Sequence, residues 1–466
     1  MRPKTICLLL AGLLMVVGCA KEGDIALPNL PPETYMALAD SVRNPTVYIQ
    51  EVRWWGSDAD GEVAGFEYRW FSDPSESGCP IDPAWVFTEE LSHTFHLPVT
   101  DGLSSHRIEV RAVDDDDAID PTPSSLTLPV TNSPPTVKLW DRGALPHTTL
   151  PALVIRWHGD DPEGSETIDH YAVWLDGEED SPLITAAEDT TISIGFDYFD
   201  GRYGERTLYL VAIDSGCDTS AVVTYTWQVE EIEGDVLLVD DLWNYAGAWL
   251  TDPFYRNAVG ASVGDFSVLD MYGFSRDHAD PASYAFNFEE LFRLFPMVVW
   301  YTEPARGATS RLKLVEDLVP SYIEGGGRLL LVSLDAVGTN GAFPDSVFLP
   351  IFGIDSLYTN LMSRTTNFDC VNWEMKANGE LGLDSLKVSG HFPGVECLEP
   401  AAGATPLYHI APFTITGFPQ TRPYYLGVLN SWGSGKVALV TAPVSRSNGY
   451  LNADAEIRKI IELVRD

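Results

Sequence analysis

The chain has 466 residues, 45% of them hydrophobic, and its 68 acidic and 29 basic side chains give a formal net charge of −39. This length predicts two to four domains, and the hydrophobic fraction excludes a largely disordered chain. The charge excludes nucleic acid as a partner and disfavours anionic lipid surfaces, because both would repel the protein. Calcium, other cations and neutral glycans remain compatible with this charge.

The first residues, MRPKTICLLLAGLLMVVGC, have the pattern of an export signal. Arg2 and Lys4 form a basic start, and the apolar run of residues 6–17 is too short to span a bilayer comfortably. Gly18 then supplies the small residue that cleavage requires, and Cys19 follows it. Residues 1–18 are therefore expected to be a signal peptide.

The end of this segment resembles the lipobox of bacterial lipoproteins, with Val16-Val17-Gly18-Cys19 as the matching residues. The resemblance implies acylation of Cys19, which would attach the protein to a membrane through its N-terminal lipid. Ala20 stands where an inner-membrane retention aspartate would stand. We therefore expect a bacterial cell-envelope protein, held in the outer membrane and facing the periplasm or the cell surface, with residues 19–30 as a tether.

An internal repeat follows the tether. The segment VRWWGSDADG at residues 52–61 returns as VIRWHGDDPEG at 154–164, and EVRAVD at 109–114 matches YLVAID at 209–214. The stretches between them alternate apolar and polar residues, as half-buried strands do. A period of about 100 residues built of such strands predicts two β-sandwiches. The predicted sandwiches span residues 31–133 and 134–231.

The repeated segments resemble fibronectin type III and related immunoglobulin-like modules. In those modules a tryptophan on the second strand packs in the core near an aromatic residue of the third strand. The resemblance implies the same sandwich fold for both repeats here. The matching residues are Trp54 with Phe66 and Trp157 with Tyr171.

Acidic residues gather in the turns of both repeats. In a sandwich of this kind, the loop after the second strand and the loop after the sixth lie at the same pole, and carboxylates from two loops suit calcium. Asp and Gly also favour tight, exposed turns without any metal. Both interpretations remain open from the sequence. The candidate calcium ligands are Asp58, Asp60 and Asp115 in the first sandwich and Asp161, Glu163 and Asp214 in the second.

The pattern changes near residue 232. GDVLLVDD, PMVVWYT and RLLLVS are continuous apolar runs, which are typical of strands buried on both faces, and helical candidates lie between them. This alternation predicts that residues 232–466 form an α/β domain with a mainly parallel sheet. The segment at about 353–425 fits the alternation poorly and is interpreted as an insertion or an added β element.

Polar residues follow the predicted strands of this domain, where open α/β sheets bind their ligands. Such a set can bind a hydroxyl-rich ligand or a cation, or can supply a general base. Asp and Ser at these junctions also commonly cap the next helix, so that interpretation stays open. The candidates are Asp240, Asp241, Glu303, Ser333 and Asp335.

Aromatic residues follow the first of these strands. Trp243 and Trp249 lie within LWNYAGAWLTDPFYRN, at the edge where a ligand would bind. Exposed there, they can stack on sugar rings. Alternatively the segment folds over the sheet and buries its aromatic side chains as a lid.

The same domain resembles the class I glutamine amidotransferase-like (flavodoxin-like) fold, through VLLVDD, VVWYTEPARG, YIEGGGRLLLVSLDA and GKVALVTAP. In that family the elbow after the strand carries a nucleophilic cysteine. Here the elbow is Val332-Ser333-Leu334-Asp335, and no histidine occurs after His409. A serine hydroxyl needs an adjacent base to act as a nucleophile. We therefore expect a domain without amidotransferase activity.

The cysteines fit an exported protein. Cys370 and Cys397 flank part of the insertion and can close it as a disulfide in an oxidising compartment. Cys79 and Cys217 lie in different predicted domains, and their state stays open. Neither a CxxC pair nor a Cys/His zinc spacing occurs in the chain.

Together these features favour a lipid-anchored extracytoplasmic binding or scaffold protein without catalytic activity. Its sandwiches would act as a spacer for an α/β domain that binds a glycan or a protein. The alternative is an extracytoplasmic hydrolase or glycan-modifying enzyme that uses the carboxyl edge of the C-terminal sheet. Calcium is the one cofactor that the sequence suggests.

Overall fold

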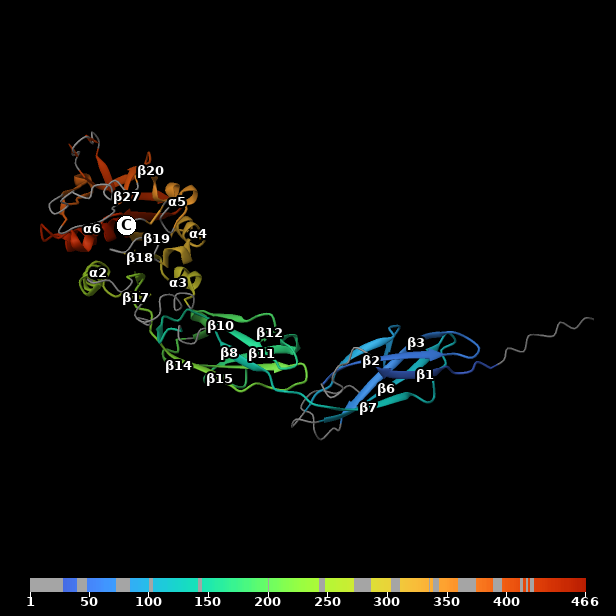
Figure 1. The fold of residues 1–466 in the computed structure, drawn as a ribbon. Helices are drawn as coiled ribbons and strands as arrows, with labels where there is room; N and C mark the ends of the chain where they lie inside the picture. Colours follow the sequence, from blue (N-terminus) through green and yellow to red (C-terminus); the bar gives the residue numbers. More distant parts are fainter. Residues whose placement is uncertain are drawn as a thin grey trace, which may run out of the picture. The chain divides into compact units, whose positions relative to one another are not determined.

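The structure is a computed structural model, and it divides into two compact units (Figure 1). One unit comprises Met1–Ser133 and Ser215–Asp218, and the other comprises Pro134–Asp214 and Thr219–Asp466. The described residues are 28–39, 48–72, 84–99, 104–140, 145–199, 201–242, 248–271, 286–302, 311–334, 336–337, 343–358, 374–388, 396–410, 414–415, 418–419 and 423–466.

The first unit is a sandwich of two antiparallel sheets, with strand orders β1-β2-β5 and β4-β3-β6-β7. Side chains alternate between the core and solvent along the strands, and Trp54 is 1% exposed at the centre. Its ring centroid lies 6.3 Å from that of Phe66, which confirms the expected core pair. The strands are β1 (Glu33–Leu38), β2 (Ile49–Ser57), β3 (Val63–Ser72), β4 (Val86–Thr88), β5 (Ser92–His96), β6 (Ser104–Asp114) and β7 (Ser124–Val130).

The second repeat is also a sandwich, with strand orders β13-β10-β8 and β12-β11-β14-β15-β9. Trp157 packs edge-on against Tyr171 at 5.6 Å, as the repeat predicts. Both repeats thus have the β-sandwich architecture that fibronectin type III and immunoglobulin-like modules share. The elements are β8 (Thr136–Leu139), β9 (Thr148–Thr149), β10 (Leu153–Asp160), β11 (Ile168–Leu175), β12 (Leu183–Ala186), β13 (Thr191–Ile194), α1 (Phe196–Phe199), β14 (Gly204–Asp214) and β15 (Val223–Val229).

The rest of the second unit is built on a large mixed sheet. Five strands, in the order β17-β16-β18-β19-β28, pair in parallel. These strands are the apolar runs of the sequence, and their side chains are buried on both faces. They are β16 (Val236–Asp240), β17 (Ser267–Asp270), β18 (Met297–Tyr301), β19 (Arg328–Val332) and β28 (Gly435–Val440).

The prediction of a mainly parallel sheet is correct for these five strands and wrong for the rest of the sheet. β27 turns back antiparallel onto β28, and the segment interpreted as an insertion adds further antiparallel strands to the same sheet. A mixed sheet results because β23 and β24 pair with β27, while β20 joins through β23 and β21 joins through β24. The added strands are β20 (Ile354–Tyr358), β21 (Glu374–Ala377), β22 (Leu386–Lys387), β23 (Cys397–Pro400), β24 (Thr405–Ile410) and β27 (Tyr424–Trp432), beside a separate pair, β25 (Thr414–Ile415) and β26 (Phe418–Pro419).

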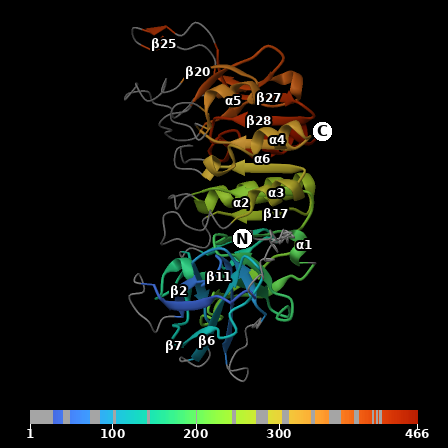
Figure 2. The same ribbon diagram turned by 90° about the vertical axis from the view of Figure 1, so that its right-hand side faces the viewer.

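Helices cover both faces of this sheet. Figure 1 shows α2 and α6 on one side of β18 and β19, with α3, α4 and α5 on the other, and Figure 2 shows the strands stacked one above another. Two separate apolar clusters, one on each face, fill the space between helices and sheet. The helices are α2 (Ala248–Val263), α3 (Phe288–Leu294), α4 (Val319–Glu324), α5 (Asp345–Phe352) and α6 (Ala453–Arg465).

The glycine run before β19 forms the expected turn into a buried strand. Gly326 has φ of +107°, a conformation that side chains rarely adopt. At Gly327 a Cβ atom would lie 2.5 Å from the ring of Tyr322. The run therefore serves backbone geometry and close packing at the amino end of the strand.

Within the second unit, the sandwich is joined to the large sheet by specific contacts. Leu150 and Ala152 belong to the same apolar cluster as α3 and α4. The backbone N–H of Phe196 donates to Glu290 Oε1 at 2.8 Å, and Asn287 Nδ2 donates to Ser193 Oγ at 2.7 Å. The sandwich is thus packed onto the domain that follows it.

The cysteines differ from the prediction. Cys397 is a free thiol, so the predicted disulfide with Cys370 is wrong; Cys370 itself lies outside the described residues. Burial in the core, followed by the charge of Glu396, raises the pKa of Cys397 to about 12. Cys217 is disulfide-bonded, and its partner lies outside the described residues.

Candidate functional site

The carboxyl ends of the five parallel strands meet at one edge of the sheet. β16 leads to Asp240 and Asp241, β17 ends at Asp270, β18 leads to Thr302, and β19 leads to Ser333. The strand order reverses between β16 and β18, because the chain adds β17 on one side of β16 and β18 on the other. In sheets of this kind, ligands bind outside the strand ends at that reversal point.

Three carboxyl groups interact at this point. Asp240 is 3% exposed and stands directly opposite Asp270 in the ladder of β16 and β17. Burial, followed by the charges of Asp252 and Asp270, raises the pKa of Asp240 to about 8. Burial also raises the pKa of Asp252, which shares a hydrogen bond with Asp240. One proton is therefore retained between Asp240 and Asp252 near neutral pH.

Tyr301 packs against this carboxyl pair. Its hydroxyl donates to Asp252 Oδ1 at 3.4 Å, and burial raises its pKa well above the ordinary value. The ring stacks on Tyr255 of α2, with centroids 4.2 Å apart. Tyr301 is thus a fixed, neutral donor at the end of β18.

The sequence analysis missed Asp252. It lies on α2, beyond the first turn of that helix, and not at a strand end, where sheets of this kind place their ligand-binding residues. The segment LTDPF offered one signal, since it lies in the first helix after the strand that carries Asp240.

Asp241 has an architectural role. It is 1% exposed, and its Oδ2 accepts from Trp300 Nε1 at 3.1 Å and from the backbone N–H of Arg311 at 2.7 Å. It therefore ties the end of β16 to the start of the 3-10 helix η5 (Arg311–Val315). This contact favours the interpretation of Asp241 as part of the loop architecture.

Ser333 is buried and paired with another hydroxyl. Ser333 and Thr302 are both 0% exposed, and Thr302 Oγ1 donates to Ser333 Oγ at 2.8 Å. A nucleophilic serine needs a base within hydrogen-bonding reach, and threonine is not one. The structure thus places Ser333 at the expected elbow, and among the described residues the hydroxyl of Thr302 contacts it.

The remaining candidates at this edge are not described. Trp243, Glu303 and Asp335 lie outside the described residues, and Trp249 lies in α2 with its side chain outside them. Cys19 lies outside them as well.

Two cavities differ in their relation to this edge. A cavity of about 380 Å³ borders Asp270 and is also lined by His147, Glu230 and Arg256. This cavity therefore borders the residue that stands opposite Asp240 in the strand ladder.

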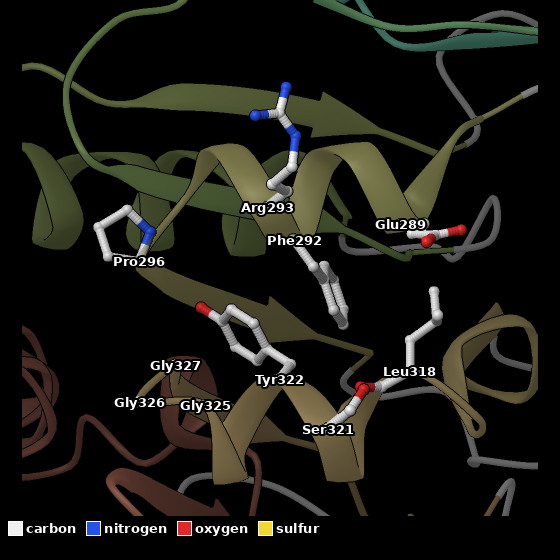
Figure 3. A pocket seen from close by; sticks show the side chains of 10 residues that line it. All are labelled: Glu289, Phe292, Arg293, Pro296, Leu318, Ser321, Tyr322, Gly325, Gly326 and Gly327. Atoms are coloured by element: carbon white, nitrogen blue, oxygen red, sulfur yellow. The ribbon is translucent and has the colours of Figure 1, made fainter.

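A second cavity, of about 410 Å³, lies between α3 and α4 at the amino ends of β18 and β19 (Figure 3). The rings of Phe292 and Tyr322 line it, and the glycine run forms part of its wall. None of the sequence candidates lines it, and it faces the end of the sheet opposite the carboxyl edge. Its position therefore does not connect it to the candidate site.

The acidic turn of the first sandwich is only partly assembled. A Cβ at Gly61 would lie 2.6 Å from Asp115 Oδ1 and 2.7 Å from Asp58 Oδ2, so these two carboxylates converge. Asp60 instead accepts from the backbone N–H of Leu30 at 3.2 Å. The carboxylate of Asp60 therefore contacts the segment before β1.

In the second sandwich, Asp161 Oδ1 accepts from the backbone N–H of Glu163 at 2.8 Å, which is a turn contact. Asp214, at the end of β14, is 1% exposed. Across the described ranges, no group of three or more acidic, histidine or cysteine side chains is arranged to hold a metal ion. The turn interpretation therefore accounts for these residues better than the calcium interpretation.

Comparison with known proteins yields no family model that matches the chain and no curated protein that matches it. Among the helices of the described residues, none is long and apolar enough to cross a bilayer.

Similar solved structures include β-sandwich modules. The fibronectin(III)-like modules of Clostridium thermocellum CbhA match at 14% identity and a TM-score of 0.20, over 42% of this chain and 94% of that one. The FN1-FN3 domains of chicken CNTN1 match at 13% identity and a TM-score of 0.18, over 44% and 68%. The PKD1 domain of Vibrio anguillarum Epp matches at 13% identity and a TM-score of 0.16, over 22% and 96%.

Proposed function

We propose that this protein is a lipid-anchored, extracytoplasmic binding or scaffold protein of the bacterial cell envelope. In this proposal Cys19 carries the lipid, and the α/β domain binds a glycan or a protein at the carboxyl edge of its sheet. The basic and apolar N-terminal segment, the acidic charge and the two β-sandwiches support it. The outer membrane is the proposed location.

The environment of Ser333 carries the non-catalytic part of this proposal. Its hydroxyl is buried and accepts a hydrogen bond from the hydroxyl of Thr302. In this proposal the strand ends are arranged as they are in α/β enzymes, but no base activates Ser333 as a nucleophile. We therefore favour ligand binding over acyl transfer as the function of the carboxyl edge.

The same proposal assigns the α/β domain to the flavodoxin-like fold. The strand order β17-β16-β18-β19-β28 corresponds to the order 2-1-3-4-5 of flavodoxin-like sheets. This order supports an amidotransferase-like α/β domain that lacks the catalytic cysteine. The antiparallel half of the sheet is then an addition to that fold.

One observation favours a hydrolase or glycan-modifying enzyme as a second candidate. The pair of Asp240 and Asp252 holds a proton near neutral pH, as a general acid does. In that case Asp240→Asn would abolish turnover of a substrate that the Ser333→Ala variant still processes.

The first test concerns the lipid. In bacteria that express the full chain and are fed labelled palmitate, we expect label on the wild-type protein and none on the Cys19→Ser variant. The cysteine is the proposed site of acylation, whereas Cys7→Ser leaves it in place and serves as the control. Equal labelling of wild type and Cys19→Ser would contradict the anchor.

The second test concerns the ligand. A glycan array probed with the chain from residue 20 onward is expected to give a ligand whose affinity drops about ten-fold in Trp243→Ala or Trp249→Ala, because a stacking surface would be lost. Trp432→Ala is the matched control: Trp432 is 38% exposed at the turn between β27 and β28, at the amino edge of β28. Unchanged binding in the first two variants would remove the carboxyl edge as the glycan site.

A further inference from the structure

Two aromatic side chains lie exposed on the outer face of the first sandwich. Tyr35 in β1 and Trp55 in β2 are direct partners in the strand ladder and are 42% and 51% exposed. Their ring centroids are 5.9 Å apart and their planes differ by 16°. Burial alternates along β2, so that Trp54 fills the core while Trp55 points away from it. The pair is therefore an addition to the sheet surface and not part of the core.

Stabilisation of the sheet does not by itself explain why two aromatic side chains are exposed here. Exposed cross-strand aromatic pairs stabilise a sheet by about 0.2–1 kcal/mol, which other strand-forming residues supply as well. Two large apolar side chains side by side in water carry a hydration cost that a solvated face does not need. Grouped exposed aromatic residues with polar neighbours are typical of a binding surface.

The neighbours of the pair are groups that bind hydroxyls. The hydroxyl of Tyr35 donates to Glu33 Oε2 at 2.6 Å, which fixes the carboxylate beside the rings. Arg53 pairs with Glu51 at 3.3 Å. Arg53 and the hydroxyl-bearing Ser57 are the next outward residues on either side of Trp55, each about 7 Å away along the strand. The rings therefore lie between groups that can donate and accept hydrogen bonds.

We propose that the face formed by Tyr35, Trp55, Glu33 and Arg53 binds a neutral oligosaccharide. The apolar C–H face of a pyranose ring would stack on the two aromatic rings, while its equatorial hydroxyls exchange hydrogen bonds with the carboxylate and the guanidinium. The formal net charge of −39 disfavours an anionic polysaccharide, and the proposal therefore names a neutral one. This site is independent of the one proposed at the carboxyl edge of the α/β sheet.

The experiment is a set of calorimetric titrations on the chain from residue 20 onward. The probes are cellohexaose, xylohexaose, mannohexaose and chitohexaose, each titrated up to millimolar concentration. We expect at least one hexaose to bind and its affinity to fall about ten-fold or more in Trp55→Ala and about three-fold or more in Tyr35→Ala, since the indole offers the larger stacking surface. Trp55→Phe should retain part of the affinity.

The matched control is Trp140→Ala. Trp140 is 67% exposed, more than Trp55, and lies in the second repeat, outside the proposed face. It should leave the titration unchanged, and thermal unfolding should show that all variants remain folded, because each side chain is exposed.

Three results would overturn the proposal. Absence of binding by all four hexaoses would do so, and that is the outcome expected if the face serves a protein partner instead. An equal loss of affinity in Trp55→Ala and Trp140→Ala would show a nonspecific effect. A loss confined to Trp243→Ala and Trp249→Ala would assign the sugar to the carboxyl edge, which separates failure of this proposal from failure of the proposed function.

Discussion

Replacing Asp240 with asparagine is expected to make the protein more stable at pH 8 to 9 and to change its stability little at pH 4. The carboxyl group of Asp240 is buried beside Asp252 and Asp270, so its ionised form is unfavourable in the folded state. Asparagine removes that ionisation. Its carbonyl can still accept from the backbone N–H of Leu242, as Asp240 Oδ1 does at 3.2 Å.

The direction of the pH dependence follows from the protonation of Asp240 in the folded and in the unfolded protein. The pKa of Asp240 is about 8 in the folded protein, against an ordinary 3.8. Between these pH values the folded state keeps a proton that the unfolded state has lost, so stability falls as pH rises through this window. The full difference corresponds to a free energy on the order of 5 kcal/mol, present as extra stability below the window and lost above it.

Calorimetric unfolding at pH 4, 6, 8 and 9 measures this effect. The wild type should lose stability steadily across the series, whereas Asp240→Asn should lose much less. Asp265→Asn is the matched control, because Asp265 is exposed just before β17 and carries the same chemical change. If the wild type and Asp240→Asn share one pH profile, the carboxyl pair does not hold the proton assigned to it.

The parts of the fold that the sequence could predict are those that depend on local pattern. Trp54 and Trp157 could be placed in two cores because each stands in a repeated, alternating strand whose buried face is set by its period of two. The strands β16, β18 and β19 could be found because continuous apolar runs are typical of strands covered on both faces.

The parts that could not be predicted depend on contacts between distant segments. β21 finds its place by pairing with β24, and β23 by pairing with β20 and β27, so their register comes from partners and not from their own short sequences. The burial of Cys397 could not be predicted for the same reason, since the pairing of β23 directs its side chain into the core.

The candidate site shows the same division. The strand ends could be predicted, and with them Asp240 and Ser333. Their chemical states could not, because they are set by residues that only the fold brings near. Asp252 approaches Asp240 from a helix, and Thr302 approaches Ser333 from the neighbouring strand β18. A polar residue at a strand end therefore predicts where the site lies, whereas the chemical state of that residue depends on neighbours from other segments.

Replacing Glu456 with alanine is expected to destabilise the second unit by about 1 to 3 kcal/mol, because it leaves buried hydrogen-bond donors without their acceptor. Glu456 is 0% exposed on α6. Its Oε2 accepts from the backbone N–H of Asp384 at 2.7 Å and from the hydroxyl of Tyr408 at 3.3 Å, and its Oε1 pairs with Lys459 at 2.8 Å. Alanine leaves these donors without that acceptor and opens a cavity beneath the helix.

Calorimetry and hydrogen exchange of the α6 amides measure this loss. Glu456→Gln should cost less than alanine because it keeps one carbonyl acceptor and the side-chain volume. Glu462→Ala is the matched control on the same helix: Glu462 is exposed, and its replacement should change stability by no more than about 0.5 kcal/mol. Equal effects of Glu456→Ala and Glu462→Ala would mean that apolar packing by Ile457, Ile460 and Ile461 holds α6 on the sheet without help from the buried carboxylate.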